Sequence, residues 1–254
     1  MPSLALLAAL SAAALVTSFI SGILGMAGGM ILMGILLALL PVPVAMMLHG
    51  ITQLASNGWR AWLWRVHVDW RVFRGYALGA LAALALFTAV QLVVSKPVAL
   101  IVLGITPFAG LALPEKLVLD VQRRGHPFAC GVICQGLNLT AGVSGPILDV
   151  FFVRSAMGRH AVVATKALTQ SASHLLKILY FGGLLGAAGG AVDLPVAALM
   201  VALAFAGTTL SRSVLERLTD ADFRLWTRWT VMATGVVYLA SGAWMLAGAP
   251  APGA

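Results

Sequence analysis

Gly22-Ile-Leu-Gly25-Met-Ala-Gly28-Gly29 is a glycine-rich run inside a longer segment, residues 1–59, that contains no Lys, Arg, Asp or Glu. A related run, Gly142-Val-Ser-Gly145-Pro146, lies in a second apolar part of the chain. A glycine-rich break lets the backbone leave a helix, and at membrane depth it is tolerated only where it lines a cavity or is buried in protein. Both runs therefore predict broken or re-entrant helices within a membrane.

The composition of the whole chain supports an all-α polytopic membrane protein. Of the 254 residues, 61% are apolar and 9% are charged, against about 45–50% and about 25% in soluble proteins. So few charges cannot cover the surface of a water-soluble domain. A membrane-spanning helix needs about 20 apolar residues, and the chain has apolar runs near 4–24, 27–40, 43–66, 71–94, 97–113, 127–141, 143–153, 159–183, 194–211 and 226–247.

The positive charges predict the orientation of these segments, because cytoplasmic loops retain Lys and Arg. Four clusters mark cytoplasmic loops: Arg60, Arg65, Arg71 and Arg74; Lys116, Arg123 and Arg124; Arg154 and Arg159; and Arg212, Arg217, Arg224 and Arg228. Both termini are then expected outside. Whether the pairs 4–40 and 127–153 are re-entrant or cross fully stays open, since either solution leaves the other segments unchanged.

An internal repeat relates the two halves at a constant offset of 117 residues. This offset places Gly25 on Gly142, Gly28 on Gly145, Thr52 on Thr169, Gln53 on Gln170, Ser56 on Ser173 and Arg60 on Lys177. The charge pattern gives the two copies opposite orientations, and inverted repeats with discontinuous helices are typical of secondary transporters. We predict a first repeat over 1–113, a cytoplasmic linker over 114–126 and a second repeat over 127–254.

The doubled glycine run, with the Thr-Gln-Ser helices that follow each copy, resembles the TauE/SafE family of sulfite and organosulfonate permeases. The resemblance extends from about residue 10 to residue 245. It implies a multi-pass transporter of the bacterial inner membrane that moves a small sulfur-containing anion and needs no cofactor. The second copy departs from the first, with Ser144 and Pro146 in place of Ala27 and Gly29.

Two polar stripes are the predicted walls of the substrate site. His49, Gln53, Ser56, Asn57 and Arg60 recur at helical spacing in the segment 43–66, and Lys166, Gln170, Ser173, His174 and Lys177 repeat that spacing in 159–183. Polar side chains at membrane depth must face a partner or water, so these stripes either contact substrate or join helices by hydrogen bonds. The predicted substrate-binding residues on the two segments are His49, Thr52, Gln53, Asn57, Lys166, Thr169, Gln170 and His174.

The glycine runs complete the predicted site. Backbone N–H groups at the N-termini of broken helices favour anions, and Gly28, Gly29 and Gly145, with Ser144 beside them, would let an anion approach closely. Close helix packing is the alternative for these glycines. Asp149 is the only acid clearly inside a segment, and it is expected to pair with Lys166 or Arg154. For Lys177, snorkelling towards the membrane surface is the alternative to a role in the cavity.

Other classes of function fit the sequence less well. The net charge of +8 lies in loops between membrane segments, so no nucleic-acid partner is expected. Cys130 and Cys134 lack further ligands at metal-binding spacing, and no metal is predicted. The rivals to a carrier are an anion channel and an intramembrane enzyme built on Ser144 and His174, the latter being the weaker. The expected partners are a small anion, the lipid bilayer and a possible second copy of the chain.

Overall fold

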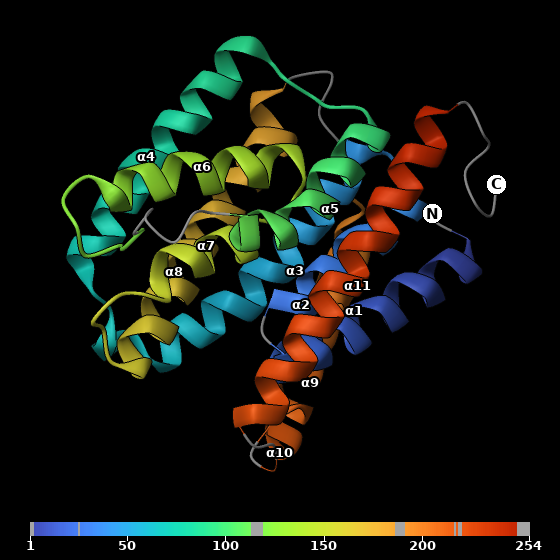
Figure 1. Cartoon of the computed structure of the whole chain (residues 1–254). Coiled ribbons are helices and arrows are strands. Elements are labelled where there is room, and N and C mark those ends of the chain that lie inside the picture. The colour runs from blue at the N-terminus through green and yellow to red at the C-terminus, as the bar shows by residue number, and fades with distance from the viewer. Residues whose placement is uncertain are drawn as a thin grey trace.

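The computed structural model describes residues 3–24, 26–112, 119–185, 191–215, 217 and 220–247. Its helices are α1 (Leu4–Leu24), α2 (Met26–Leu39), α3 (Val42–Leu63), α4 (Trp70–Val90), α5 (Lys96–Ala112), α6 (His126–Thr140), α7 (Gly145–Phe152), α8 (Arg159–Leu179), α9 (Leu194–Leu210), α10 (Arg212–Leu215) and α11 (Asp220–Leu246). Two short elements, η1 (Arg65–His67) and the π-helical turn η2 (Tyr180–Leu184), follow α3 and α8. All the regular structure described is helical, which confirms the all-α prediction (Figure 1).

The predicted segments correspond to helices one by one, with one large difference at an end. The last segment was expected from residue 226, whereas α11 begins at Asp220. The first turns of α11 contain Asp220, Asp222 and Arg224, so an argument based on hydropathy starts the segment after them. The portion Leu225–Leu246 is long and apolar enough to cross a membrane. Of the predicted linker 114–126, residues 114–118 lie outside the described residues.

Both glycine runs interrupt the helices at the predicted places. The first break separates Leu24 from Met26, and the second separates Thr140 from Gly145. In the second, Gly142 has a φ of +80°, a conformation in which a side chain is strained. At 1.5 Å per residue, α2 (14 residues) and α7 (8 residues) are about 21 Å and about 12 Å long, too short for a hydrocarbon core of about 30 Å. The helices that follow the breaks therefore end within the thickness of a membrane.

Helices far apart in the sequence pack side by side. The principal pairs are α1 with α9, α4 with α6, α5 with α11 and, in the centre, α3 with α8. Glycines permit the close approaches: a Cβ at Gly131 on α6 would overlap the carbonyl oxygen of Tyr76 on α4, and one at Gly104 on α5 would lie 2.8 Å from that of Gly235 on α11. Small residues at helix contacts are the usual solution in membranes, because they let backbones approach closely.

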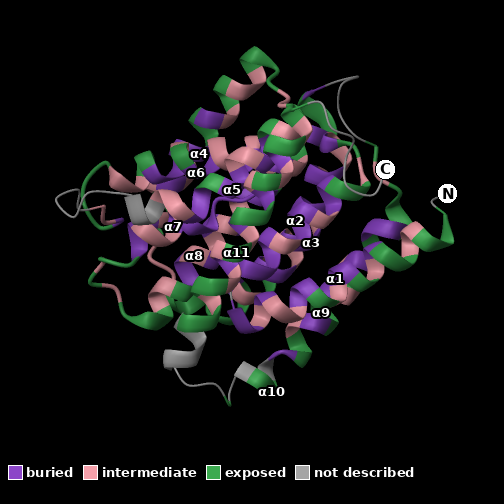
Figure 2. Ribbon diagram, turned by 45° about the vertical axis from the view of Figure 1, so that its right-hand side comes forward, coloured by how far each residue is buried: buried purple, intermediate pink, exposed green. Residues whose placement is uncertain are grey.

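The outer surface of the bundle is apolar, as a membrane protein requires. Leu78, Leu86 and Val90 on α4 and Val237 and Trp244 on α11 are all more than half exposed. Among the described residues, three helices are long and apolar enough to cross a membrane: Leu4–Leu24, Trp70–Val90 and Leu225–Leu246. Figure 2 shows the complementary pattern, in which the buried residues concentrate in central helices such as α2 and α3. The chain therefore presents apolar side chains both to its own core and to its surroundings.

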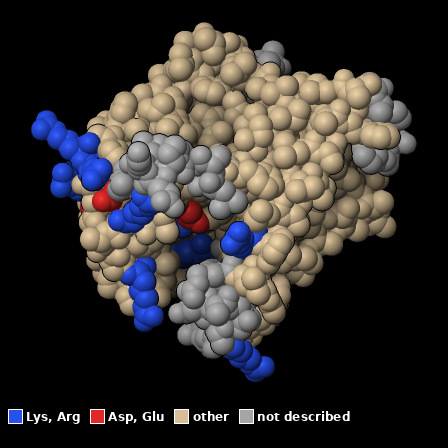
Figure 3. Space-filling view, viewed as in Figure 1, with Lys and Arg blue, Asp and Glu red and all other residues tan. Residues whose placement is uncertain are grey.

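The loops rich in positive charge meet at one end of the molecule. The backbone N–H of Asp69 donates to the Thr165 hydroxyl at 2.9 Å, and the N–H of Ala156 donates to the Gln122 side chain at 2.8 Å. The Trp64 ring stacks on His160 with centroids 5.0 Å apart. In Figure 3 the Lys and Arg atoms of the visible face gather in its lower left part. Three of the predicted positive loops thus lie on the same side, as the orientation argument requires.

The two cysteines pack as small buried side chains in the hydrophobic core. Cys130 and Cys134 on α6 are both free and buried, with sulfur atoms 3.9 Å apart. They pack with Tyr76, Leu148 and Phe151 in the smaller of two hydrophobic clusters, where α4, α6, α7 and α8 meet. In the part of the chain that the structure describes, no group of His, Cys, Asp or Glu could hold a metal ion.

Candidate functional site

A cavity lies where the two helix breaks meet the central pair α3 and α8. The side chains of the two polar stripes face each other there, because α3 and α8 run antiparallel: His49 near the start of α3 contacts Lys177 near the end of α8, and Trp64 after α3 contacts His160 at the start of α8. The lining residues are Ser21, Met26, Gly29, His49, Gln53, Asn57, Arg60, Val143, Ser144, Gly145, Gln170, Ser173 and His174.

Most of the predicted site residues line this cavity. They are His49, Gln53, Asn57, Gln170, His174, Gly29, Ser144 and Gly145. Gln53 on α3 and Gln170 on α8, which the repeat relates to each other, therefore line the same cavity. The side-chain amide of Asn57 donates to Oε1 of Gln53 at 3.4 Å, a long hydrogen bond that leaves the amide nitrogen of Gln53 as a donor for another group.

Three other predicted residues have structural roles outside the lining. The Thr52 hydroxyl donates to the Leu48 carbonyl at 2.8 Å, and the Thr169 hydroxyl donates to the Lys166 carbonyl at 2.9 Å. These hydrogen bonds lie within their own helices and occupy the only proton that each hydroxyl has. A Cβ at Gly28 would overlap the carbonyl oxygen of Thr17 on α1. Gly28 therefore packs α2 onto α1, which is the alternative that the sequence left open for the glycines.

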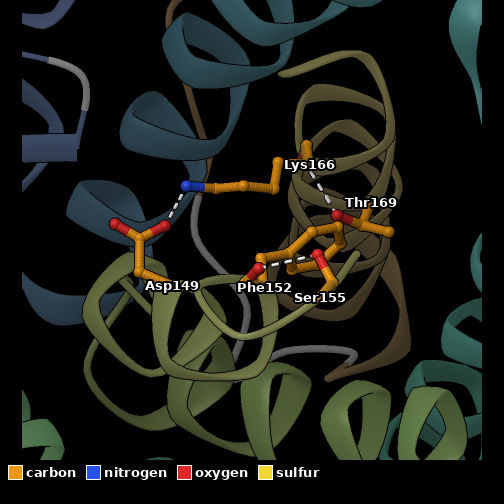
Figure 4. Close-up of polar contacts among 5 residues, drawn as sticks. All are labelled: Asp149, Phe152, Ser155, Lys166 and Thr169. Atoms are coloured by element: carbon orange, nitrogen blue, oxygen red, sulfur yellow. Dashed lines mark hydrogen bonds and ion pairs between the residues drawn. The ribbon is translucent and has the colours of Figure 1, made fainter. Parts of the chain in front are cut away.

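Lys166 also lies outside the lining, because it forms an ion pair with Asp149. Figure 4 shows its side chain extending from α8 towards the carboxylate of Asp149 on α7. Of the two partners that the sequence allowed for Asp149, Lys166 and Arg154, Lys166 forms an ion pair with it. The side chains are 24% and 37% exposed, and their opposite charges largely cancel at a distance. Lys166 thus adds less positive potential to the cavity than an isolated lysine would.

Arg60 is the principal residue of the site that the sequence argument missed. It was counted with the arginines that orient the loops, yet it lines the cavity from the last turns of α3. The stripe held the information that could have found it, since Arg60 lies three residues after Asn57 on the same helix face. Its guanidinium offers five N–H donors in a planar fork suited to an oxyanion.

Lys177 is buried rather than snorkelling. Its side chain is 0% exposed, and its Nζ lies 2.8 Å from Nδ1 of His49 and donates to the carbonyl oxygen of Gly142 at 2.9 Å. The His49 ring in turn lies at 5.4 Å from the His174 ring, measured between centroids. The Nδ1 atom of His174 is buried and has no hydrogen-bond partner among the described residues, so a donor or acceptor at the cavity wall is left for a bound group.

The charges around the cavity favour an anion. Arg60 lines it directly, and Lys177 contacts the lining residue His49, whereas none of the lining residues is an acid. Met26 and Gly145 are the first residues of α2 and α7, so two helix N-termini with their partial positive charge lie at the cavity. A low-dielectric cleft lined by one sign of charge concentrates the opposite ion.

The size of the cavity suits a small solute. It offers about 30 Å³ to the centres of water-sized groups, which corresponds to a compact particle of about 3 Å radius. The polar side chains at its wall are two glutamines, an asparagine, an arginine, two histidines and three serines, all of them residue types that carry a hydrogen-bond donor. Together, the apolar exterior, the broken helices and the cavity between them define a multi-pass membrane protein of the transporter class.

Comparison with known families agrees with this class. The family model described as "Sulfite exporter TauE/SafE" matches residues 10–238, and the chain belongs to the TauE/SafE family. Its members are membrane transporters rather than enzymes, which removes the intramembrane enzyme from the alternatives. No curated protein and no solved structure gave a match.

Proposed function

We propose that the protein moves a small sulfur-containing anion, sulfite or a short-chain organosulfonate, across the bacterial inner membrane by alternating access. The observation on which the proposal rests is the cavity at the junction of the two helix breaks, lined by Arg60, Gln53 and Gln170 and by no acidic residue. A sulfonate or sulfite anion has three acceptor oxygens and no N–H donor. A wall of hydrogen-bond donors with a cation among them complements it.

Each group of the wall has a distinct part in this proposal. Arg60 supplies a bidentate, charge-assisted contact to two oxygens. Gln53 and Gln170 donate neutral hydrogen bonds from opposite helices, and the backbone N–H groups at the start of α7 add partial positive charge. A Cβ at Gly145 would lie 2.8 Å from the Cβ of Met26, so the absence of a side chain there lets the first residues of α2 and α7 meet at the cavity.

The packing of the helices supports an inverted repeat of the segments 1–113 and 127–254. The offset of 117 residues relates α1 to α6. After a seven-residue insertion, which aligns Val68-Asp69 with Val192-Asp193, the repeat relates α4 to α9. The contact of α1 with α9 is then equivalent to the contact of α6 with α4. In the other two pairs, α3 with α8 and α5 with α11, each helix packs against its own counterpart in the other repeat. This is the pattern that a two-fold axis between α3 and α8 would produce. The repeats exchange their first helices, so neither repeat is a separate domain in space.

With such an axis, the proposed site would lie between the two halves. Alternating access then requires one group of helices to rock against the other around a fixed site. The positive loops at one end of the bundle assign that end to the cytoplasm, and the cavity residue Arg60 lies nearest to it on α3. Lys177 lies near the opposite end of the bundle, in the last turn of α8.

A transport assay with a defined panel tests the proposal. Purified protein is screened by thermal shift with sulfite, thiosulfate, taurine, sulfoacetate and isethionate, and the anions that stabilise it are followed into proteoliposomes. We expect saturable uptake and counterflow, in which an internal pool of unlabelled anion accelerates the entry of labelled anion. Uptake without counterflow would favour a channel, and no binding of any panel member would refute the proposal.

A further inference from the structure

Lys177 and His49 form a buried pair that joins the two helix breaks. From Lys177, one contact runs to the carbonyl of Gly142 in the second break and another to Nδ1 of His49. Nε2 of His49 lies 2.9 Å from the carbonyl oxygen of Gly29, just after the first break. His49 is 1% exposed and Lys177 is 0% exposed. Lys177 is thus enclosed by protein, with the side chain of His49 between it and the cavity.

The hydrogen bonds of this pair are compatible with two protonation states of Lys177. A carbonyl oxygen only accepts, so His49 has its proton on Nε2 and presents the lone pair of Nδ1 to Lys177. A neutral Lys177 amine has two N–H donors, which satisfy Nδ1 of His49 and the Gly142 carbonyl. A protonated amine keeps both bonds and gains a third N–H. A proton can therefore bind to the lone pair of Nζ, or leave it, without breaking either contact.

Nothing described around the pair balances the charge of the protonated amine. The titratable groups on the elements packed around this part of α8 are His49 on α3, His174 on α8, Tyr76 on α4, Tyr180 of η2, Cys134 on α6 and Asp149 on α7. Asp149 is the only carboxylate of this set, and it is paired with Lys166. An unbalanced charge is costly within a membrane protein, and ionisable groups there normally pair with an opposite charge. The protonated pair therefore needs an anion.

The cavity supplies the place for that anion. His49 is a lining residue of the cavity and a partner of Lys177 at once, and His174 lines the cavity one turn before Lys177. We propose that Lys177 and His49 form a proton-binding site coupled to the anion cavity, so that one proton moves with each anion. This inference rests on the proposed function, because the cavity must first bind an anion.

Coupling in this arrangement is reciprocal. An anion in the cavity favours the proton on Lys177, and the proton favours the anion by the same factor, as thermodynamic linkage requires. The proton comes from water on the side to which the cavity is open and returns to water on the opposite side after the anion leaves. A singly charged anion then crosses the membrane without net movement of charge.

Proton uptake on anion binding is the direct test. Isethionate, whose sulfonate does not titrate near neutral pH, and sulfite are titrated into the purified protein in Tris and in bicine at the same pH. These buffers have different heats of ionisation, and neither is a sulfonate that could occupy the site. For the wild-type protein we expect the binding enthalpy to depend on the buffer, which corresponds to uptake of up to about one proton per anion.

Two variants assign the proton to Lys177. K177R keeps a permanent positive charge, so it should bind the anion with almost no proton uptake. K177M should also lose the uptake and bind more weakly. K96M, at the start of α5 and away from the pair, is the control and should match the wild type. With sulfite, which can itself take up a proton, the difference between wild type and K177R isolates the part that belongs to the protein.

The outcomes separate this inference from the proposed function. If an anion binds to the wild type with the same enthalpy in both buffers, corrected for the protonation of sulfite, the proton site is refuted while the anion site stands. Retention of the wild-type proton uptake in K177R or K177M refutes it as well. If neither anion binds to the wild type, the proposed function fails and the coupling fails with it. Should both Lys177 variants fail to fold, the wild-type titration still tests the coupling, because equal enthalpies in the two buffers refute it.

Discussion

Replacing Arg60 by Gln should weaken anion binding far more than replacing a neighbouring arginine. Arg60 lines the cavity, and R60Q keeps an amide donor there but removes the charge and the planar fork. Hydrogen bonds to a charged partner contribute about 1.5–3 kcal/mol, which corresponds to about 10- to 150-fold in Kd. Because guanidinium contacts to oxyanions are bidentate, we expect the upper half of that range.

Arg65 provides the matched control. It lies just after α3 with an exposed side chain, and its guanidinium donates to the Trp62 carbonyl at 3.0 Å and lies 4.4 Å from the Trp62 ring centroid. R65Q removes the same charge from the same end of the helix without touching the cavity. We expect it to change Kd less than about twofold at 0.1 M salt, where charges further apart than about 10 Å are screened. R60K, which keeps the charge and loses the fork, should be intermediate.

Isothermal titration of sulfite, or of the tightest-binding anion of the panel, measures all three variants. The titrations are repeated at low and high ionic strength, because a direct contact with Arg60 should resist salt and a long-range effect should not. An R60Q protein that is folded and binds within twofold of the wild type would refute the assignment of Arg60 to the site. If R60Q and R65Q lose the same amount of affinity, Arg60 acts only through its long-range charge and does not contact the anion.

Three further predictions concern the same site and the packing of α2 on α1 beside it. Q53A and Q170A should each weaken binding by about 10- to 150-fold while the protein still folds, as titration and thermal unfolding would show. K166M leaves Asp149 without its partner, so binding should weaken, most clearly at low salt; the double variant K166M/D149N should return to within about twofold of the wild type. G28A forces a methyl group against the α1 backbone, and the overpacking should cost about 1–3 kcal/mol of stability, measured as a lower thermal midpoint.

Each of these has an outcome that would contradict it. Wild-type affinity in both glutamine variants would show that the stripes only join the helices. A K166M/D149N protein as weak as K166M alone would mean that Lys166 contacts the anion directly. For G28A the control is G183A, at a position where an added Cβ has no neighbour within 4 Å; equal midpoints for the two variants would show that α2 does not need its close contact with α1.

The positions of the helices and of both breaks could be predicted from the sequence, because they depend on local properties of the chain. Apolar runs of the right length specify membrane helices, and the two glycine runs interrupt them where the structure has breaks at Leu24–Met26 and Thr140–Gly145. The constant offset between the halves also predicted that Gln53 and Gln170 belong to one site, and both line the cavity. Periodicity thus identified the faces of α3 and α8 that turn inward.

The part that each polar residue plays was decided by the tertiary structure alone. Spacing along a helix places Lys166 and Lys177 on the same stripe, yet one pairs with Asp149 at the edge of the site and the other is buried between two helix breaks. The sequence groups Arg60 with the arginines of a loop, whereas the packing of α3 against α8 brings it to the cavity. The reason is physical: a helical period specifies a direction from the helix axis, whereas the partner met in that direction depends on segments more than a hundred residues away.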